Sequence, residues 1–263
     1  MVKATRGFGL AGESPTDTIY IAAVAAEQAG YGSFWLSQPR HGLTLVDLGS
    51  VARKTQTIRV GVGAIPLTAQ SPGEIESLVR ELAIPLDRLR LGIGSGMGTG
   101  SLDRLRAGVE TLRSLIDVEI VVAPLGPKMC RLAGEIADAV LLNWLTPAHA
   151  STSLSWIRDG ALSRERDMPV TATYVRCALG ADARSRLEME CARYGSFPHY
   201  AAHFSRQGVQ PIQTTIHANS DWELQERIAA YESVLDEVIV RAITSSDTSS
   251  EILALVESAK PEN

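Results

Sequence analysis

The chain has 263 residues, of which 45% are hydrophobic, and its formal net charge is −5. This size allows one barrel-sized α/β domain or two smaller domains. The negative charge argues against nucleic acid or an anionic membrane surface as a partner. The apolar runs are too short to cross a bilayer, and the N-terminal residues lack the apolar centre of a signal peptide, so we expect a cytoplasmic protein.

Short apolar runs with strand character recur along the chain, and helical patterns lie between them. The runs are residues 7–10, 33–37, 58–64, 89–93, 118–122, 139–142, 170–177 and 237–241. No proline-rich or low-complexity linker divides them. Eight such units predict an α/β protein that folds as a single (β/α)8 TIM barrel over residues 1–263. Residues 184–225 depart from the compact pattern, and we expect them to form a helical lid over the barrel.

In such barrels the reactive groups follow the C-terminal ends of the strands. Glu13 comes after the first strand, where its carboxyl group could act as an acid or a base; a plain surface carboxylate is the alternative. Trp144 lies at the end of the sixth strand and could stack on a ring system or pack in the core. Cys130, Cys177 and Cys191 are odd in number and scattered, which favours free thiols.

Residues 118–142 read as a strand, a glycine turn, a helix and a second strand joined by a parallel crossover. Gly126 and Pro127 open the helix, and Lys128 adds a positive charge at the same end. Free backbone N–H groups at a helix N-terminus bind phosphate well. The segment therefore indicates a phosphate site, and a simple tight turn is the alternative reading.

The glycine-rich segment at residues 92–100 does not match a dinucleotide-binding fingerprint in any register, and no Walker lysine follows it. A hydrolase nucleophile elbow has glycines two residues before and after its serine. Ile93 and Met97 occupy these places around Ser95, so the segment is not such an elbow. The segment is consistent with a loop whose bare backbone lies against a ligand, or with a flexible surface loop.

His199 and His203 have the spacing of metal ligands on a helix, with Cys191 upstream. Tyr200 occupies the place where a zinc protease needs glutamate, and no third strong ligand is evident. We therefore expect no metal site and assign these residues to the lid helix.

Five blocks follow one another over residues 5–150: FGLAGES, AEQAGYGSFWLS, IRVGVGAIPL, DRLRLGIGSG and LGPKMCRLAGEIADAVLLNWLTP. Together they resemble the luciferase-like monooxygenase superfamily. The similarity is greatest to the branch that uses the deazaflavin coenzyme F420 and includes methylenetetrahydromethanopterin reductase. This resemblance implies a (β/α)8 barrel that holds a flavin or deazaflavin at its strand ends.

The resemblance also implies roles for individual residues. A bulge, often with a non-prolyl cis peptide bond, is expected at Gly63-Ala64 beneath the tricyclic ring. The remaining cofactor-binding residues are expected to be Ser37, Ser95, Gly96, Leu125, Gly126, Pro127 and Lys128, of which those in the fifth-strand loop would hold the phosphate.

Several positions depart from the family pattern. The Asp-His pair that commonly follows the tryptophan of the second strand is replaced by Gln38-Pro39, and the glycine-rich loop has Met97 and Thr99 instead of glutamate. Gln70-Ser71 stands in place of a basic or histidine residue before Pro72. The usual excursion before the fifth strand is almost absent.

We therefore predict an oxidoreductase that transfers a hydride between reduced coenzyme F420 and a small organic substrate with a C=N, C=C or C=O bond. We also expect a homodimer. Glu13 or Gln38 would orient or protonate the substrate, and His41, Trp144 and His199 would line its pocket. The alternatives are an FMN-dependent monooxygenase and a catalytically silent barrel that retains a flavin site or an interaction surface.

Overall fold

The computed structural model describes residues 4–38 and 44–262. Within these residues, eight parallel strands close into a barrel in which β9 pairs with β1. These strands are β1 (Thr5–Ala11), β2 (Ser33–Ser37), β3 (Arg59–Pro66), β4 (Leu89–Gly94), β5 (Glu119–Val122), β6 (Ala139–Asn143), β7 (Val170–Leu179) and β9 (Glu237–Ala242). Every apolar run identified in the sequence forms one of them, so the predicted TIM barrel is confirmed.

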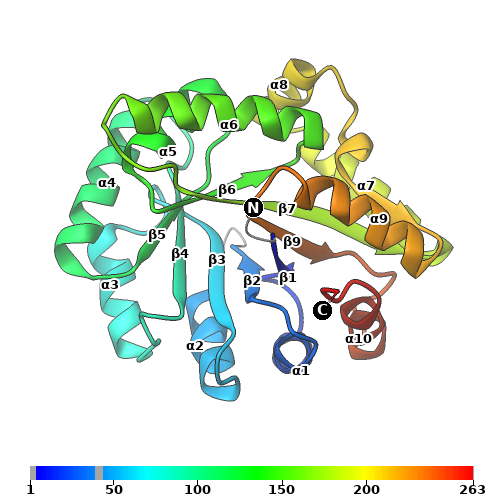
Figure 1. The fold of residues 1–263 in the computed structure, drawn as a ribbon. Coiled ribbons are helices and arrows are strands. Elements are labelled where there is room, and N and C mark those ends of the chain that lie inside the picture. Colours follow the sequence, from blue (N-terminus) through cyan, green and yellow to red (C-terminus); the bar gives the residue numbers. More distant parts are fainter. Residues whose placement is uncertain (1–3, 39–43, 263) are drawn as a thin grey trace.

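Helices surround the strands on the outside of the barrel (Figure 1). They are α1 (Thr16–Gln28), α2 (Thr44–Lys54), α3 (Pro72–Glu81), α4 (Ser101–Leu115), α5 (Pro127–Ile136), α6 (Pro147–Leu162), α7 (Arg184–Gly195), α8 (Pro198–Gln207), α9 (Asp221–Glu232) and α10 (Ser249–Ser258). Side-chain caps fix several of their starts. Ser71 and Glu74, for example, form a capping box at α3 that satisfies two backbone N–H groups.

A short ninth strand, β8 (Ile216–Ala218), was not predicted. Cys177 of β7 pairs with Ala242 of β9 and also with Ile216, so β8 lies on the other edge of β7, beyond the last residue of β6. Three residues are too few to show an alternating pattern in the sequence. The strand anchors the segment that returns from α7 and α8 to the barrel wall.

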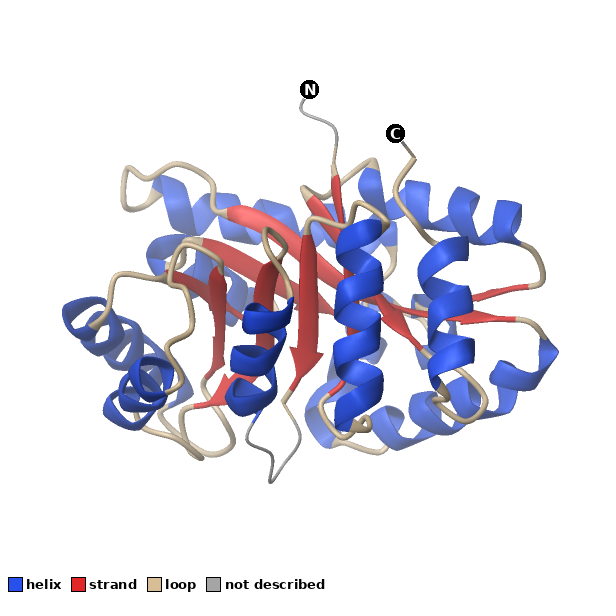
Figure 2. Cartoon of the chain, turned by 90° about the horizontal axis from the view of Figure 1, so that it is seen from below, coloured by secondary structure: helices blue, strands red, loops and turns tan. Residues whose placement is uncertain are grey.

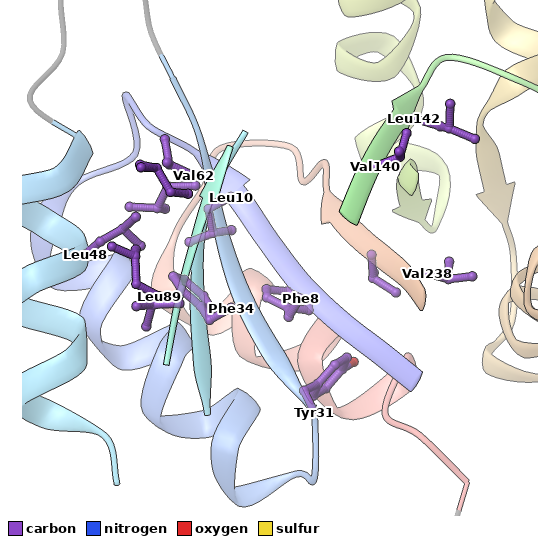
Figure 3. Close-up of a cluster of buried hydrophobic side chains, with 14 of the residues drawn as sticks. Phe8, Leu10, Tyr31, Phe34, Leu48, Val62, Leu89, Val140, Leu142 and Val238 are labelled. Carbon is purple, nitrogen blue, oxygen red and sulfur yellow. The ribbon is translucent and has the colours of Figure 1, made fainter. Parts of the chain in front are cut away.

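The main core lies between the outer face of the barrel and the helices. Figure 3 shows Phe8, Leu10 and Phe34 on the first strands, with Leu48 of α2 packed toward them. Figure 2 shows the helices that cover the strands from another side. Burial of these apolar side chains is the main source of stability.

A second core fills the inside of the barrel around Trp35, which is completely buried. Glycine makes the space for this indole: a Cβ atom on Gly61 would lie 2.3 Å from the Trp35 ring. Tyr174 of β7 packs edge-on against Trp35, with ring centroids 6.1 Å apart. The interior is therefore a packed core rather than a channel.

Charged side chains close the N-terminal end of the barrel. Arg90 lies between Glu119, at 2.8 Å, and Glu237, and Ser33 donates a hydrogen bond to Glu237. The Trp35 indole N–H donates to the Ser33 hydroxyl at 2.8 Å. The buried charges at this end have partners of opposite sign, which is the arrangement that a stable interior requires.

Candidate functional site

A cavity of about 820 Å³ lies at the C-terminal ends of the strands, and we call it the mouth cavity. Its floor comes from residues at strand ends and the loops that follow them, and α7 and α8 form a wall. This volume is in the range of pockets that bind cofactors and small ligands. Residues that line the mouth cavity include Ala11, Glu13, Ser37, Gln38, Met97, Met189, Glu190, Tyr194, His199, Tyr200 and Arg241.

Four of the residues singled out in the sequence lie in this lining: Glu13, Ser37, Gln38 and His199. Glu13 is exposed at the rim, whereas Ser37 and Gln38 are half-buried at the end of β2. Partial burial lowers the pKa of the His199 imidazole below its ordinary value, so the ring is mainly neutral at pH 7. His41 lies outside the described residues.

Trp144 is placed away from the mouth cavity. It is completely buried and packs with Tyr194 and Phe204 beneath α7 and α8. The Arg176 guanidinium lies over its indole ring, 3.8 Å from the ring centroid. In this position Trp144 supports the helices that wall the mouth cavity.

The third strand has an irregular end at the centre of the barrel. The peptide bond between Gly63 and Ala64 is cis, and the register between β3 and β4 shifts between Val62 and Ile65. Both features agree with the bulge that the family resemblance implies here. The hydroxyl of Tyr174 lies beneath this bulge, is buried and has no hydrogen-bond partner in the described part of the chain.

The glycine-rich loop after β4 is held in one conformation. Gly96 has a positive φ of 71°, and a Cβ atom there would lie 2.0 Å from the Thr68 hydroxyl oxygen. Arg104 of α4 donates hydrogen bonds to the carbonyl groups of Ser95, at 2.7 Å, and Met97, at 3.1 Å. The loop is thus a defined surface beside the mouth cavity, with Met97 71% exposed.

The start of α5 has the features of an anion site. Gly126 is the N-cap residue, has a φ of 84° and provides no side-chain cap. The next residue, Pro127, has no N–H, and helix geometry leaves the N–H groups of Lys128 and Met129 without acceptors inside the helix. The positive end of the helix dipole is therefore open at this point.

Arg206 of α8 lies against the same helix end. Its guanidinium atoms are 3.3 to 3.4 Å from the place of a Cβ atom on Gly126. Within residues 4–38 and 44–262 no ion pair or hydrogen bond to another side chain or carbonyl is found for this arginine. Arg206 is exposed, so solvent screens its repulsion with the positive end of the helix, and its guanidinium is free to bind an anion together with the α5 N–H groups. Arg206 and the α5 N-terminus therefore fit a phosphate group.

A buried ion network forms the floor of the mouth cavity. Arg176 of β7 donates to Glu190 of α7 at 2.9 Å and also bonds the Asn143 side chain. Arg241 of β9 lies on the other side of Glu190, with 3.9 Å between the nearest nitrogen and oxygen. Burial alone would raise the pKa of Glu190, but Arg241 and Arg176 outweigh it and hold that pKa below its ordinary value.

Arg104, Arg206, Glu190 and Arg241 were not predicted. A signal was present for Arg241, because Glu237, Ile239 and Arg241 stand two residues apart on one face of the buried strand Glu237–Ala242, which places both charges inside the barrel with Ile239. Glu190 reaches the site from α7 and Arg206 from α8. Only the packing of these two helices reveals that both residues belong to the site.

The histidines considered as metal ligands have another role. His203 is buried, and one of its ring nitrogens bonds the Trp144 carbonyl oxygen at 2.9 Å. Burial lowers the pKa of His203 to about 4, and nearby His149 and Arg206 act in the same direction. No group of three potential metal ligands occurs in the part of the chain that the structure describes. Likewise, none of the described helices has the length and apolarity that a membrane span requires.

Residues 3–111 match the family model described as luciferase-like monooxygenase. The chain is 25% identical, over 205 residues, to a 5,10-methylenetetrahydromethanopterin reductase of Methanolobus tindarius, with 62% of this chain and 61% of that protein covered. The predicted resemblance to the luciferase-like superfamily is confirmed. The N-terminal half of the barrel, which holds the bulge and the glycine-rich loop, carries most of the luciferase-like signal.

An uncharacterised protein of Bacillus subtilis is 32% identical over 104 residues, which are 36% of this chain and 31% of that protein. The matched part of the chain thus spans about a third of the length of the Bacillus subtilis protein and about three fifths of the length of the Methanolobus tindarius reductase.

Solved structures share the whole luciferase-like barrel at low sequence identity. An F420-dependent secondary alcohol dehydrogenase superposes with a TM-score of 0.80 at 14% identity and covers 99% of this chain and 100% of its own. The coenzyme F420-dependent tetrahydromethanopterin reductase of Methanopyrus kandleri gives 0.72 at 15% identity, with 98% of both chains covered. The FMN complex of a Pseudomonas putida diketocamphane monooxygenase gives 0.75 at 15% identity, covering 98% and 97%. These similarities establish the fold.

Proposed function

We propose that this protein is an oxidoreductase that transfers a hydride between reduced coenzyme F420 and a small organic substrate with a C=N, C=C or C=O bond. The observation that carries the proposal is the combination of the bulge in β3, where the register with β4 shifts between Val62 and Ile65, with an uncapped α5 N-terminus faced by Arg206. One feature suits a planar ring and the other a phosphate, and both belong to the same end of the barrel.

The chain's own residues would bind and orient the two reactants. The N–H groups of Lys128 and Met129, with Arg206, would hold the cofactor phosphate. The Gly63-Ala64 bulge would fix the ring face, and the backbone of Ser95 and Gly96 would border it. When bound, the deazaflavin supplies the hydride chemistry.

The substrate side of the mouth cavity offers few proton donors. Gln38 can orient a polar group by hydrogen bonding, and Glu13 at the rim can deliver a proton after exchange with solvent. The neutral imidazole of His199 can donate one hydrogen bond and accept another. We assign His199 to substrate binding and Glu13 to proton delivery.

Titration of the purified protein with coenzyme F420 and with FMN, followed by absorbance and fluorescence, tests the proposal. We expect saturable binding of F420 that is at least about tenfold tighter than binding of FMN. Tight FMN binding without F420 affinity, together with oxygen uptake, would instead assign the barrel to the monooxygenases, as the similarity to the diketocamphane monooxygenase permits. Binding of neither cofactor would support a silent barrel, in line with the absent Asp-His pair after β2.

A matched pair of glycine substitutions tests the phosphate site. Gly126→Glu introduces a carboxylate at the α5 N-terminus, and charge repulsion should weaken F420 binding by about a hundredfold or more. Gly126→Gln is the control, because it carries the same backbone strain at a φ of 84° but no charge. The Gln variant should bind F420 much more tightly than the Glu variant, and equal binding by both variants would place the phosphate elsewhere.

A further inference from the structure

Two arginines share one carboxylate at the floor of the mouth cavity, and of these three residues Glu190 and Arg241 line the cavity. Glu190 is the only carboxylate in the described residues that lies between Arg176 and Arg241. Arg176 forms the close ion pair at 2.9 Å, whereas Arg241 stays 3.9 Å away, beyond hydrogen-bond distance. One carboxylate thus faces two buried guanidinium groups, and it accepts a hydrogen bond from Arg176 but none from Arg241.

Most N–H donors of the Arg241 guanidinium have no hydrogen-bond acceptor in the described residues. Its guanidinium donates a hydrogen bond to the Ala242 carbonyl oxygen, and the described residues provide no other hydrogen-bond acceptor for it. It is 7% exposed, and it lines the mouth cavity. A guanidinium presents five N–H donors in a planar fork that matches a carboxylate. Unused donors of a nearly buried arginine therefore border the space where a ligand would lie.

The other charged groups around the cavity do not neutralise Arg241. Asp247 pairs with Arg186, whose guanidinium also donates to the Thr244 carbonyl oxygen at 3.2 Å. Glu13 and Arg193 carry opposite charges and are both exposed, so solvent screens their fields. Arg241 is consequently the least compensated buried charge of the lining.

The rim of the mouth cavity carries apolar side chains beside the charged Glu13 and Arg193. Met97 is 71% exposed and Met189 is 64% exposed, and Phe197 and Pro198 lie near them in the lining. Exposed methionine and aromatic side chains around a concave surface favour a ligand with an apolar part. The cavity therefore combines the guanidinium of Arg241 at its floor with apolar side chains at its rim.

Resting on the proposed function, we propose that the substrate of this site carries a carboxylate, bound by Arg241, and an apolar portion that contacts Met97 and Met189. Arg241 is a specificity-determining residue in this scheme. Arg176 and Glu190 position it: Arg176 occupies the near oxygen of Glu190, which leaves the Arg241 fork available to the ligand.

Binding of two small probes of equal length, hexanoate and hexanamide, to the full-length protein tests the proposal. Calorimetric or NMR titrations should give an affinity at least about tenfold higher for hexanoate, because a charge-assisted hydrogen bond replaces a neutral one. Equal affinities within threefold, or no hexanoate binding at concentrations where hexanamide binds, would overturn the proposal. This comparison requires no variant.

Variants then locate the preference. Arg241→Met should remove the hexanoate preference, and Arg241→Lys should keep part of it, since the charge remains but the fork is lost. Arg184→Met is the control, because Arg184 lies on the exposed start of α7, pairs with Glu188 and does not line the mouth cavity. Loss of preference in an Arg193→Met variant instead of Arg241→Met would assign the carboxylate to the rim and contradict the proposal.

Titration of the same variants with F420 separates this inference from the proposed function. If F420 binds and hexanoate shows no preference, the substrate class is wrong and the cofactor assignment stands. If hexanoate shows the preference and F420 does not bind, the carboxylate site exists in a barrel of another function.

Discussion

At the N-terminal end of the barrel, Arg90 lies between two carboxylates, whereas at the C-terminal end Glu190 lies between two arginines. The carboxylates at the N-terminal end also bond Arg59 and Ser33, so charges of both signs are matched there. At the C-terminal end Arg176 and Arg241 share one carboxylate, and Arg206 has no ion pair in the described residues. The comparison supports a stabilising role for the N-terminal end and the proposed anion-binding role for the C-terminal end.

The first prediction removes the charge match at the N-terminal end. Glu237→Gln removes one of the two carboxylates beside the buried Arg90 and leaves Glu119 as its partner, so the free energy of unfolding should fall by about 3 kcal/mol. Denaturant titration followed by circular dichroism measures it. Glu257→Gln, which removes an exposed pair with Lys260, should cost less than about 1 kcal/mol. Equal losses of unfolding free energy in the Glu237→Gln and Glu257→Gln variants would contradict a stabilising role for the charges at the N-terminal end.

The second prediction concerns pH and the C-terminal end. The pKa of His203 is about 4 in the folded protein against an ordinary value of 6.5, so the unfolded chain binds a proton first as the pH falls. Stability should therefore be complete above pH 6.5 and should decrease by up to about 3 kcal/mol toward pH 4.

A His203→Gln variant provides the measurement. Its stability should depend less on pH than that of the unchanged protein, when each is compared between pH 7 and pH 4.5 by thermal or chemical unfolding. If the two proteins lose stability in parallel over this range, His203 is not the group that titrates.

The third prediction tests the packing between the two ends. Gly61→Ala places a methyl group 2.3 Å from the Trp35 ring and should destabilise the protein by about 1 to 3 kcal/mol. Gly73→Ala, in open space on α3, should be neutral or stabilise by up to about 1 kcal/mol. A Gly61→Ala protein as stable as its control would contradict the packed interior.

The smallest expected effect has the opposite sign. Tyr174→Phe removes a buried hydroxyl that has no partner in the described residues. The free energy of unfolding should therefore rise by at most about 1 kcal/mol, and the melting temperature should rise with it. Differential scanning calorimetry is sensitive enough to detect this change. A lower melting temperature would show that the hydroxyl is hydrogen-bonded in the ligand-free protein.

The sequence was sufficient for the barrel because its signal is local. Each barrel strand lies in a short apolar run of the sequence; β5 (Glu119–Val122), for example, lies in the run 118–122. The glycine and proline at residues 126 and 127 then start the next helix. The cis bond at Gly63-Ala64 came from family resemblance and is present in the structure. The register of β8 and the positions of Arg206 and Glu190 depend on how α7 and α8 pack, which no local pattern encodes.

Trp144 illustrates the same limit. Its position at a strand end suggested contact with a ligand, but the indole is covered by Tyr194 and Phe204 and stacks on Arg176. Which side of a strand end faces the ligand depends on the helices that cover it. Arg241, two residues beyond the inward-facing Ile239, shows that inward alternation along a strand is the more useful guide.

A crystal structure of the protein with coenzyme F420 tests the central claim most directly. We predict the phosphate within hydrogen-bond distance of the Lys128 and Met129 N–H groups and of Arg206, with the deazaflavin ring against the Gly63-Ala64 bulge. A cofactor bound elsewhere, or an empty mouth cavity at saturating F420, would contradict the assignment of the C-terminal end as the cofactor site.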